Sequence, residues 1–292
     1  MQTIDLTNVS IDNIESTLLK EKNIELSVLR IDKIHPVISG NKWFKLKYYL
    51  KNYAANNYEG IITFGGAWSN HIIATASTCA MLNTKSIGII RGEKPKKLSA
   101  TLQFAESFGM QLQFISRENY KQKNTFYLTE LKKQFPHFYF IPEGGRGESG
   151  EKGAGEILDL VTKIDYTHIA CAIGTGTMFS GICKASTPSQ KIIGIEVLKG
   201  LNSITSPTPN AIIYSEFHFG GYAKYTTELI NFMNNFYEET KIPTDFVYTG
   251  KLFYAIMELI KKDRFPQGSK LLVIHSGGLQ GNSSLQKELL KF

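Results

Sequence analysis

Short apolar runs alternate with helix-like segments along most of the chain, from about residue 60 onward. The runs that predict strands are 60–66, 86–92, 111–116, 138–145, 167–176, 191–197, 211–217 and 270–278. Apolar residues spaced three and four apart predict helices at 69–82, 98–109, 124–135, 151–161, 178–185, 226–239 and 250–265, before a short terminal helix. Short strands that alternate with helices are typical of parallel sheets covered on both faces. The pattern therefore predicts an α/β fold.

Four of the predicted strands end in glycine clusters. These are Gly65-Gly66, Gly144-Gly145, Gly174-Thr175-Gly176 and Gly277-Gly278. Ligands of open α/β sheets bind outside the carboxyl ends of the strands, and glycine lets a backbone approach a ligand closely. An ordinary turn explains any single cluster. Four clusters on one edge favour a shared ligand site.

The segment AIGTGTMFSG (172–181) follows an apolar strand and opens a helix. Free amides of residues 174–178 are expected at the helix N-terminus, where the dipole favours an anion such as phosphate. The candidate phosphate-binding residues are Gly174, Thr175, Gly176 and Thr177. The spacing matches neither a Walker loop nor GxGxxG. A plain turn is the alternative reading.

Composition and charge narrow the classes of protein that fit this pattern. The chain has 292 residues, 42% of them apolar and 20% charged, which suits a soluble protein of one large or two modest domains. The net charge is +7, but the lysines are scattered and no nucleic-acid motif accompanies them, so we expect no nucleic-acid partner.

Cysteines and hydropathy indicate the compartment. Cys79, Cys171 and Cys183 share no metal or disulfide spacing, which suits a reducing environment and predicts no metal site. The first residues lack the basic-then-apolar pattern of a signal segment. No apolar run reaches about 18 residues, so no membrane span is expected. We therefore expect a cytoplasmic protein.

The segment ISGNKWFKLKYYL (38–50) places Lys42 behind a glycine turn, at the start of an apolar helix. Such a lysine together with a phosphate loop suggests pyridoxal 5′-phosphate (PLP), which forms a Schiff base with a lysine amine. Burial beside aromatic residues would weaken the preference of this lysine for its charged form. Lys45 lies on the same helical face and could reach the phosphate. The alternative is an amphipathic helix with solvated lysines.

The segment around Lys42 resembles GGNKxRKLEY of the fold-type-II PLP enzymes typified by 1-aminocyclopropane-1-carboxylate (ACC) deaminase and D-cysteine desulfhydrase. Further segments resemble other motifs of this family in order: GGAWSNH (65–71), IPEGGRGESGEKGAGE (141–156), GTGTMFSG (174–181), GGYAKYTTE (220–228), DFVYTGK (245–251) and LLVIHSGGLQG (271–281). The resemblance implies a two-domain, tryptophan synthase β-like architecture and a homodimer. It places a larger PLP-binding domain at 1–45 and 149–292, and a smaller α/β domain at 46–148.

The resemblance also implies a role for each matching side chain. By these matches the Schiff-base lysine is Lys42, the phosphate-contacting lysine is Lys45, and the contact to the ring hydroxyl oxygen is Asn70. The substrate-carboxylate contact and candidate proton carrier is Ser69. The active-site tyrosines are Tyr222 and Tyr248, and the residue facing the pyridine nitrogen is Ser276.

Several positions depart from the family pattern. Trp68 replaces the glutamine before the serine of the SNH motif, and Ile73 follows where a nearby arginine is usual. Ser39 replaces the first glycine of GGNK, and Ala223 replaces the second glycine of GYG. We therefore expect a pocket that has diverged from that of the typical members.

Two positions bear on the substrate. ACC deaminases of this family carry glutamate and leucine where desulfhydrases carry small hydroxyl residues, and here these positions hold Thr249 and Ser276. A neutral partner of the pyridine nitrogen supports less carbanion character on the substrate than a carboxylate would. Elimination of sulfide needs less of this character, because sulfide leaves readily. The resemblance therefore favours β-elimination from D-cysteine, giving pyruvate, ammonia and sulfide. Candidates for the Cα base are Lys42, Ser69 and Tyr248.

Three hypotheses about function stay open at this point. The leading one is a PLP-dependent lyase acting on a small amino acid, of the D-cysteine desulfhydrase type. The second is an ACC deaminase, or another deaminase or racemase. The third is a PLP-binding protein with little turnover that acts as a carrier or sensor.

Overall fold

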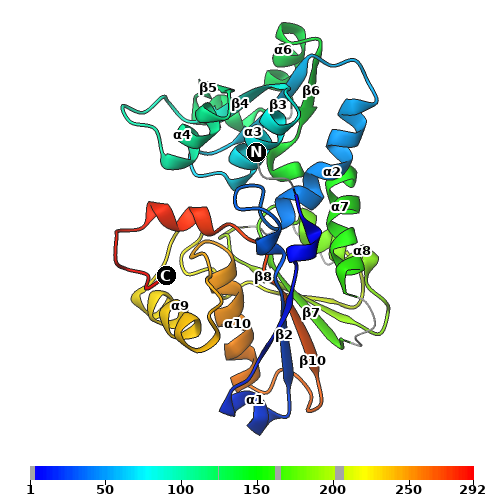
Figure 1. Ribbon diagram of the computed structural model, residues 1–292, viewed down its shortest axis with the longest axis vertical. Coiled ribbons are helices and arrows are strands. Elements are labelled where there is room, and N and C mark those ends of the chain that lie inside the picture. Colours follow the sequence, from blue (N-terminus) through cyan, green and yellow to red (C-terminus); the bar gives the residue numbers. More distant parts are fainter. Residues whose placement is uncertain (1–3, 124, 162–165, 201–206) are drawn as a thin grey trace.

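The computed structural model describes residues 4–123, 125–161, 166–200 and 207–292, and these residues form two β-sheets (Figure 1). The strand order is β1-β2-β10-β7-β8-β9 in the six-stranded sheet and β5-β4-β3-β6 in the four-stranded sheet. The first sheet contains β1 (Ile11–Ile14), β2 (Glu25–Leu29), β7 (His168–Ile173), β8 (Lys191–Glu196), β9 (Ala211–Tyr214) and β10 (Lys270–Ile274). The second contains β3 (Gly60–Gly65), β4 (Lys85–Arg91), β5 (Met110–Ile115) and β6 (Phe138–Ile141).

The strand pairs are parallel except at one edge of the larger sheet. There β1 runs antiparallel to β2, with Ile11 opposite Leu29. The parallel α/β prediction is confirmed for the strands from β3 onward. The sequence pattern did not predict β1, β2 or the short helix α1 (Thr17–Lys22) between them.

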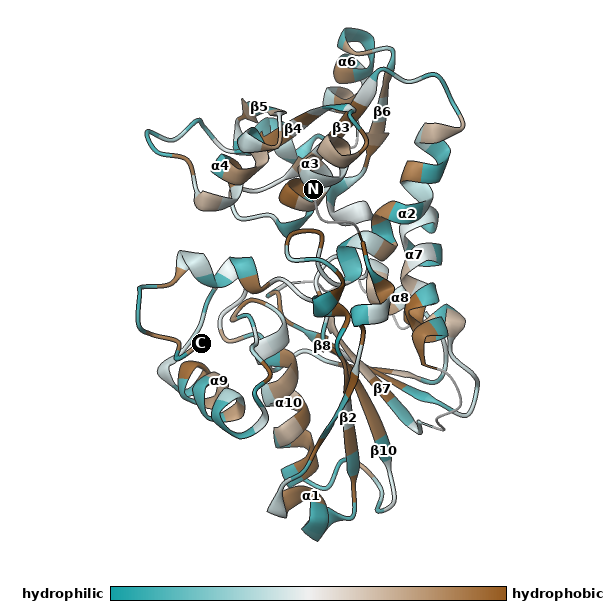
Figure 2. Cartoon of the chain, viewed as in Figure 1, coloured by the Kyte–Doolittle hydropathy of each residue, from teal (hydrophilic) through white to brown (hydrophobic). Residues whose placement is uncertain are grey.

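The six-stranded sheet buries apolar side chains on both faces, as its continuous apolar strands predict (Figure 2). Along β7, Ala170 and Ala172 face one way and Ile169 and Cys171 the other. The first face packs against α1, α9 (Thr227–Thr240) and α10 (Thr249–Lys261). The second face packs against α7 (Glu148–Gly155), α8 (Thr177–Ala185) and the start of α2 (Asn41–Ala54).

The four-stranded sheet is covered in the same way. On one face lie α3 (Asn70–Met81), α4 (Ala100–Ser107) and the later part of α2. On the other face lie α5 (Arg117–Lys121) and α6 (Phe126–Gln134), which bury Tyr120 and Leu131.

Some predicted helices differ from those observed. The helix predicted at 151–161 begins at Glu148, and a 3-10 helix continues it from Glu156 to Leu160. The helix predicted at 124–135 corresponds to α6, its first residue lying outside the described residues, and α5 precedes it unpredicted. The terminal helix is a 3-10 helix, Leu279–Ser284, instead of an α-helix at the end of the chain.

Helix α2 passes from one sheet to the other. Phe44 packs in the core of the six-stranded sheet, whereas Leu46 and Tyr49 pack in the core of the four-stranded sheet. The strands β3 to β6 lie within 46–148, and the remaining strands lie within 1–45 and 149–292. We propose these limits as the domain boundaries, because the core changes at this point of α2.

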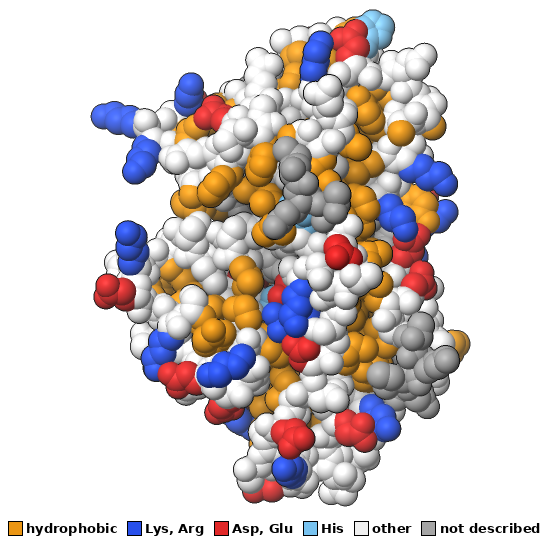
Figure 3. Space-filling view, viewed as in Figure 1, with side chains coloured by type: hydrophobic (Ala, Val, Ile, Leu, Met, Phe, Trp, Pro, Cys, Tyr) orange, Lys and Arg blue, Asp and Glu red, His pale blue; other side chains and the backbone are white. Residues whose placement is uncertain are grey.

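The surface shows no gathering of one charge on the face drawn in Figure 3, where basic and acidic side chains are scattered. Among the described residues, no helix has the length and apolar content needed to cross a membrane.

Helix α7 lies against the backbone of α2. A side chain at Gly153 would overlap the carbonyl oxygen of Phe44, and one at Gly150 would overlap that of Gly145. Glycine therefore lets α7 approach closely, and this contact fixes the helix that carries Lys42 and Lys45.

Gly153→Ala should lower the free energy of unfolding by about 1–3 kcal/mol, the usual cost of overpacking. In a helix without such a close neighbour, the same change would raise the free energy of unfolding by roughly 0.5–1 kcal/mol. The sign of the change therefore shows whether α7 contacts the backbone of α2. Urea unfolding measures the difference. Gln134→Ala, on exposed α6, is the control and should stay within about 0.5 kcal/mol. A stabilised Gly153→Ala variant would contradict the packing.

Candidate active site

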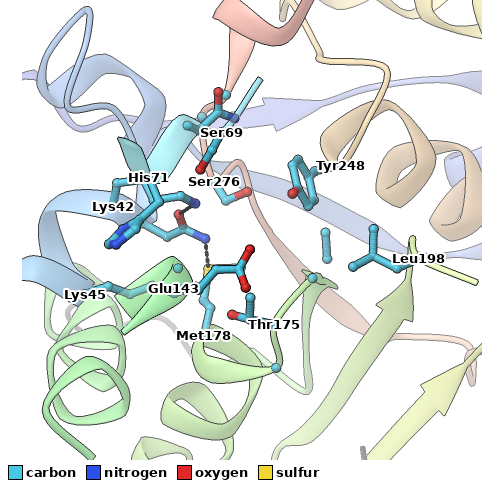
Figure 4. A pocket seen from close by; sticks show the side chains of 18 of the residues that line it. Lys42, Lys45, Ser69, His71, Glu143, Thr175, Met178, Leu198, Tyr248 and Ser276 are labelled. Atoms are coloured by element: carbon cyan, nitrogen blue, oxygen red, sulfur yellow. Dashed lines mark hydrogen bonds between the residues drawn. The ribbon is translucent and has the colours of Figure 1, made fainter. Parts of the chain in front are cut away.

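A cavity of about 240 Å³ lies where the carboxyl ends of strands from both sheets meet (Figure 4). Ten of the residues predicted for the site line it: Lys42, Lys45, Ser69, Asn70, Gly174, Thr175, Gly176, Tyr222, Tyr248 and Ser276. Thr177 is buried beside it, its hydroxyl 3.1 Å from that of Thr175. All four glycine clusters contribute residues to the lining of this cavity. The expectation of one sheet edge is wrong, because two clusters follow β3 and β6 and two follow β7 and β10.

Gly40 sets the position of Lys42. Its φ is +61°, and a side chain there would overlap the carbonyl oxygen of Ser276. The amide of Asn41 donates to that same oxygen at 3.2 Å. Because only glycine fits this contact, the start of α2 docks against the chain that leaves β10. Lys42 consequently enters the cavity from one side, opposite Tyr248 (Figure 4).

The Lys42 amine is prepared to act as a nucleophile. Its Nζ donates a hydrogen bond of 2.7 Å to Oδ1 of Asn41. Burial lowers the pKa of Lys42 to about 8, and the Asp245 carboxylate opposes this shift. At neutral pH the Lys42 side chain is then the free amine in about a tenth of the molecules, a far larger fraction than for a solvated lysine.

Lys45 adds a second buried cation on the same helix. Only 5% of its surface is exposed. Burial and then the nearby Lys42 hold its pKa well below the ordinary value, and Cys171 opposes them. Among the described residues, no carboxylate lies within ion-pair distance of either lysine. Buried cations without a counter-ion favour an anionic ligand.

The loop before α8 offers the matching anion site. Gly176 precedes the helix with φ +83° and no side chain caps it. The first amides of α8 are therefore left for a ligand, with the helix dipole behind them. Gly144 lies against this loop, because a side chain at that position would come within 2.9 Å of Thr175.

The start of α3 presents polar atoms without partners. Ser69 precedes the helix, and its hydroxyl accepts the amide hydrogen of Ile72 at 3.3 Å. Oδ1 of Asn70 and Nδ1 of His71 are both buried with no hydrogen-bond partner among the described residues. Unpaired buried acceptors are rare in native proteins, so a bound group is expected here.

His71 is a neutral residue of the cavity wall. The hydroxyl of Thr63 donates to the carbonyl of Ile141 at 2.9 Å and lies 2.8 Å from Nε2 of His71. Burial, and next the two lysines, lower the pKa of His71 to about 3. The sequence analysis did not assign a role to this residue.

These features fit PLP. Lys42 would bind its aldehyde carbon, Lys45 and the amides of α8 would hold its phosphate, and Asn70 would contact a polar atom of its ring. The argument rests on the uncompensated lysines and the unpartnered Asn70 oxygen. Among the described residues, no group of three or more His, Cys, Asp or Glu side chains is placed to hold a metal ion.

The two tyrosines of the cavity hold their protons. Burial holds the pKa of Tyr248 well above the ordinary value, with Tyr222 and Asp245 adding to the shift. The pKa of Tyr222 is also raised, although 41% of the residue is exposed to solvent; burial is the main cause and Arg91 opposes it. Both phenols stay protonated at neutral pH. Of the candidate bases, Tyr248 is therefore less suited than Lys42.

Thr249 does not line the cavity, although the sequence analysis used it to judge the substrate. Its buried hydroxyl donates to Oδ1 of Asp245 at 2.7 Å and accepts from the Asp245 amide at 2.8 Å. The Asp245 carboxylate also accepts the amides of Val247 and Tyr248 at 2.9 Å. Thr249 thus orders the start of α10. Of the two hydroxyl residues used to judge the substrate, Ser276 is the one that lines the cavity.

The sequence analysis missed two charged residues of the cavity, Arg91 and Glu143. Arg91 ends β4, and Nη2 would lie 3.5 Å from a side-chain carbon at Gly66. It has no carboxylate within ion-pair distance among the described residues, whereas Glu143 pairs with Lys123 at 3.3 Å. Both residues lie at or near carboxyl ends of strands, and that position could have revealed them.

The departures from the family pattern have local explanations. Ser39 is buried, and its hydroxyl accepts the amide hydrogen of Gly278 at 3.3 Å. Ala223 keeps the left-handed backbone of the glycine it replaces, with φ +52°. Ile73 is buried in a helix, and Trp68 is half-buried and is not one of the residues that line the cavity.

Comparisons with known proteins agree with PLP as the cofactor. Residues 16–277 match the family model described as pyridoxal-phosphate dependent enzyme. A mitochondrial bifunctional D-cysteine desulfhydrase/ACC deaminase of Arabidopsis thaliana is 29% identical, over 88% of this chain and 73% of that protein. A Pyrococcus abyssi protein, whose name gives ACC deaminase as a provisional assignment, is 27% identical over 93% and 90% of the two chains.

A crystal structure of an ACC deaminase homologue superposes with a TM-score of 0.80 at 24% identity, covering 94% of this chain and 90% of that one. This likeness shows the two-domain α/β fold of such enzymes.

Borohydride reduction of the PLP-loaded protein should leave a pyridoxyl group on Lys42, because this amine combines access to the cavity with a lowered pKa. Peptide mass spectrometry locates the group. Lys42→Ala should carry none, whereas Lys47→Ala, an exposed lysine of the same helix, should be labelled like the native chain. Labelling on Lys45 in the native chain would overturn the assignment.

Lys45→Met should weaken PLP binding by about 1–3 kcal/mol, the scale of a hydrogen bond to a charged group. Methionine is unbranched and only one atom shorter than lysine, so the change removes the charge and its hydrogen-bond donors with little loss of volume. Fluorescence titration of the apoprotein with PLP measures the affinity, again with Lys47→Ala as control. Unchanged affinity would remove Lys45 from the phosphate site.

Proposed function

Because the chain belongs to the family of pyridoxal-phosphate dependent enzymes, we propose that it is a lyase acting on a small amino acid, with D-cysteine as the leading substrate. Family membership confirms the prediction of an enzyme that uses PLP. The substrate and the roles of individual residues are the proposal.

The observation that carries the proposal is an amine with a pKa of about 8 on one side of the cavity and a protonated phenol on the other. When bound, PLP supplies an aldehyde that takes the substrate amine and a ring that accepts the electrons of the broken Cα bond. Lys42 Nζ then takes the Cα proton. The Tyr248 hydroxyl is placed to give a proton to the departing sulfur.

The start of α3 supports an amino acid as the substrate. Ser69 and Asn70 line the cavity, and their hydroxyl and side-chain amide can donate hydrogen bonds to a carboxylate. Arg91 stands beside the same loop, close to Gly66, without a carboxylate partner among the described residues. A cation at this position favours a ligand that brings its own carboxylate.

ACC is the second candidate, because the names of both relatives include ACC deaminase. D-cysteine is preferred on chemical grounds. It has a Cα proton for Lys42 to remove and a thiol that leaves readily, whereas ACC has neither. The neutral Ser276 faces the cavity, and a hydroxyl partner of the ring nitrogen supports less carbanion character than a carboxylate would.

We also infer a homodimer in the cytoplasm. The resemblance to the family supports the dimer, and Cys79, Cys171 and Cys183, all free and buried, suit a reducing compartment. Light scattering of the purified protein tests the dimer, and a monomer would exclude it.

Two assays on one preparation test the substrate. Pyruvate release from D-cysteine should be faster than 2-oxobutyrate release from ACC, because only D-cysteine offers a Cα proton to Lys42. Lys42→Ala is the control and should abolish the faster activity. Faster turnover of ACC would overturn the desulfhydrase assignment. PLP binding without turnover of any amino acid in a D- and L-panel would leave the carrier or sensor as the function.

A further inference from the structure

Lys251 is a fully buried lysine in the first turn of α10, outside the residues that line the cavity. Its Nζ donates to three main-chain carbonyl oxygens: Gly221 at 2.7 Å, His218 at 2.9 Å and Val197 at 3.3 Å. Among the described residues, no carboxylate is within ion-pair distance. A cation held only by carbonyl oxygens is the environment that proteins give to monovalent ions such as K⁺.

A buried charge of this kind is expensive. Burial lowers the pKa of Lys251 to about 8, with Asp245 opposing, so the side chain is mostly charged at neutral pH. Its neighbours Leu252 and Phe253 are fully buried apolar residues. An apolar residue of similar size would avoid the desolvation cost. The reason for a lysine must lie in the three carbonyls that it holds.

Those carbonyls belong to the chain just before two residues of the cavity wall. Val197 precedes Leu198, and Gly221 precedes Tyr222; both following residues line the cavity. Lys251 itself follows Tyr248, a third lining residue, by three positions on the same turn. One ammonium group therefore joins three parts of the wall opposite Lys42.

The segment that carries Tyr222 is strained. Phe219 and Ala223 have φ of +50° and +52°, and the two glycines between Phe219 and Tyr222 also have positive φ. Left-handed backbone costs free energy for residues with a side chain and persists only where surrounding contacts impose it. The Tyr222 side chain is 41% exposed, so its own packing does not fix it.

A second contact from the same helix reaches this segment. The Phe219 ring packs edge-on against Tyr254 of α10, with centroids 4.9 Å apart. Helix α10 thus holds the segment through one apolar contact and one cation. The cation is the contact that reaches both the segment at 218–221 and the chain after β8.

We propose that Lys251 is a positioning residue whose ammonium serves as a built-in monovalent cation, holding Tyr222 and Leu198 in place on the substrate side of the cavity. The inference concerns whichever small amino acid the enzyme takes. It requires that loss of this cation weakens substrate binding while PLP stays bound.

Lys251→Met in the PLP-loaded enzyme tests the positioning role. Affinity for D-alanine, a ligand without a leaving group, is measured by the change in PLP absorbance and should fall between about tenfold and a hundredfold. PLP retention should stay unchanged. Lys261→Met, an exposed lysine of α10, is the matched control and should bind as the native enzyme does. If D-alanine gives no signal, an amino acid from the panel that does is used.

A double-mutant cycle separates positioning from general damage. In a Tyr222→Ala background, Lys251→Met should reduce amino-acid affinity by less than about threefold, because the side chain that it positions is gone. An equal loss in both backgrounds, or no loss in the native background, would overturn the role.

Rescue by added cations tests whether the Lys251 ammonium acts as a built-in ion, and its melting-temperature readout needs no substrate. In Lys251→Ala, ammonium or K⁺ should raise the melting temperature and amino-acid affinity above the values in tetramethylammonium at equal ionic strength. The native enzyme should not distinguish these salts. If the variant folds poorly, its refolding yield in the same salts is the readout. Equal results in all three salts for the variant would overturn the cation role.

Discussion

The contact between Gly40 and the carbonyl of Ser276 is the constraint on which the site depends. No side chain fits there, so the turn before α2 must press its backbone onto the chain leaving β10. That contact fixes where α2 starts, and α2 then crosses from the core of one sheet to the core of the other. Gly153 brings α7 onto the same helix from behind. The position of Lys42 is thus determined by main-chain contacts, which tolerate less movement than packed side chains.

The electrostatics of the cavity follow from that geometry. Lys42 and Lys45 enter on one helical face, without a carboxylate in ion-pair distance among the described residues, and the free amides of α8 lie nearby. Burial, and then this positive charge, lower the pKa of His71 and keep it neutral. Each of these features costs free energy in the absence of an anion and gains from one. A ligand that brings a phosphate therefore stabilises the folded state as well as completing the site.

The sequence predicted those parts of the site that depend on local pattern. The turn before Lys42 and the loop at 174–177 could be read from glycine placement beside an apolar run. Arg91 and Glu143 were missed, although both lie at or near the carboxyl ends of strands, where ligands of α/β sheets bind. Thr249 shows a related limit: its neighbour Tyr248 lines the cavity, but its own hydroxyl donates to Asp245. Which way a buried side chain points depends on tertiary partners that spacing does not encode.

Two lysines of this chain show why a shifted pKa alone does not identify a reactive group. Burial lowers the pKa of both Lys42 and Lys251 to about 8, and Asp245 opposes the shift in both. Their hydrogen bonds differ. Lys251 has its three donor hydrogens taken by three carbonyls, so its nitrogen has no room for another partner. Lys42 donates to one amide oxygen and otherwise faces the cavity. The unfilled hydrogen-bonding capacity, rather than the shift, makes Lys42 the amine that can take up a substrate proton.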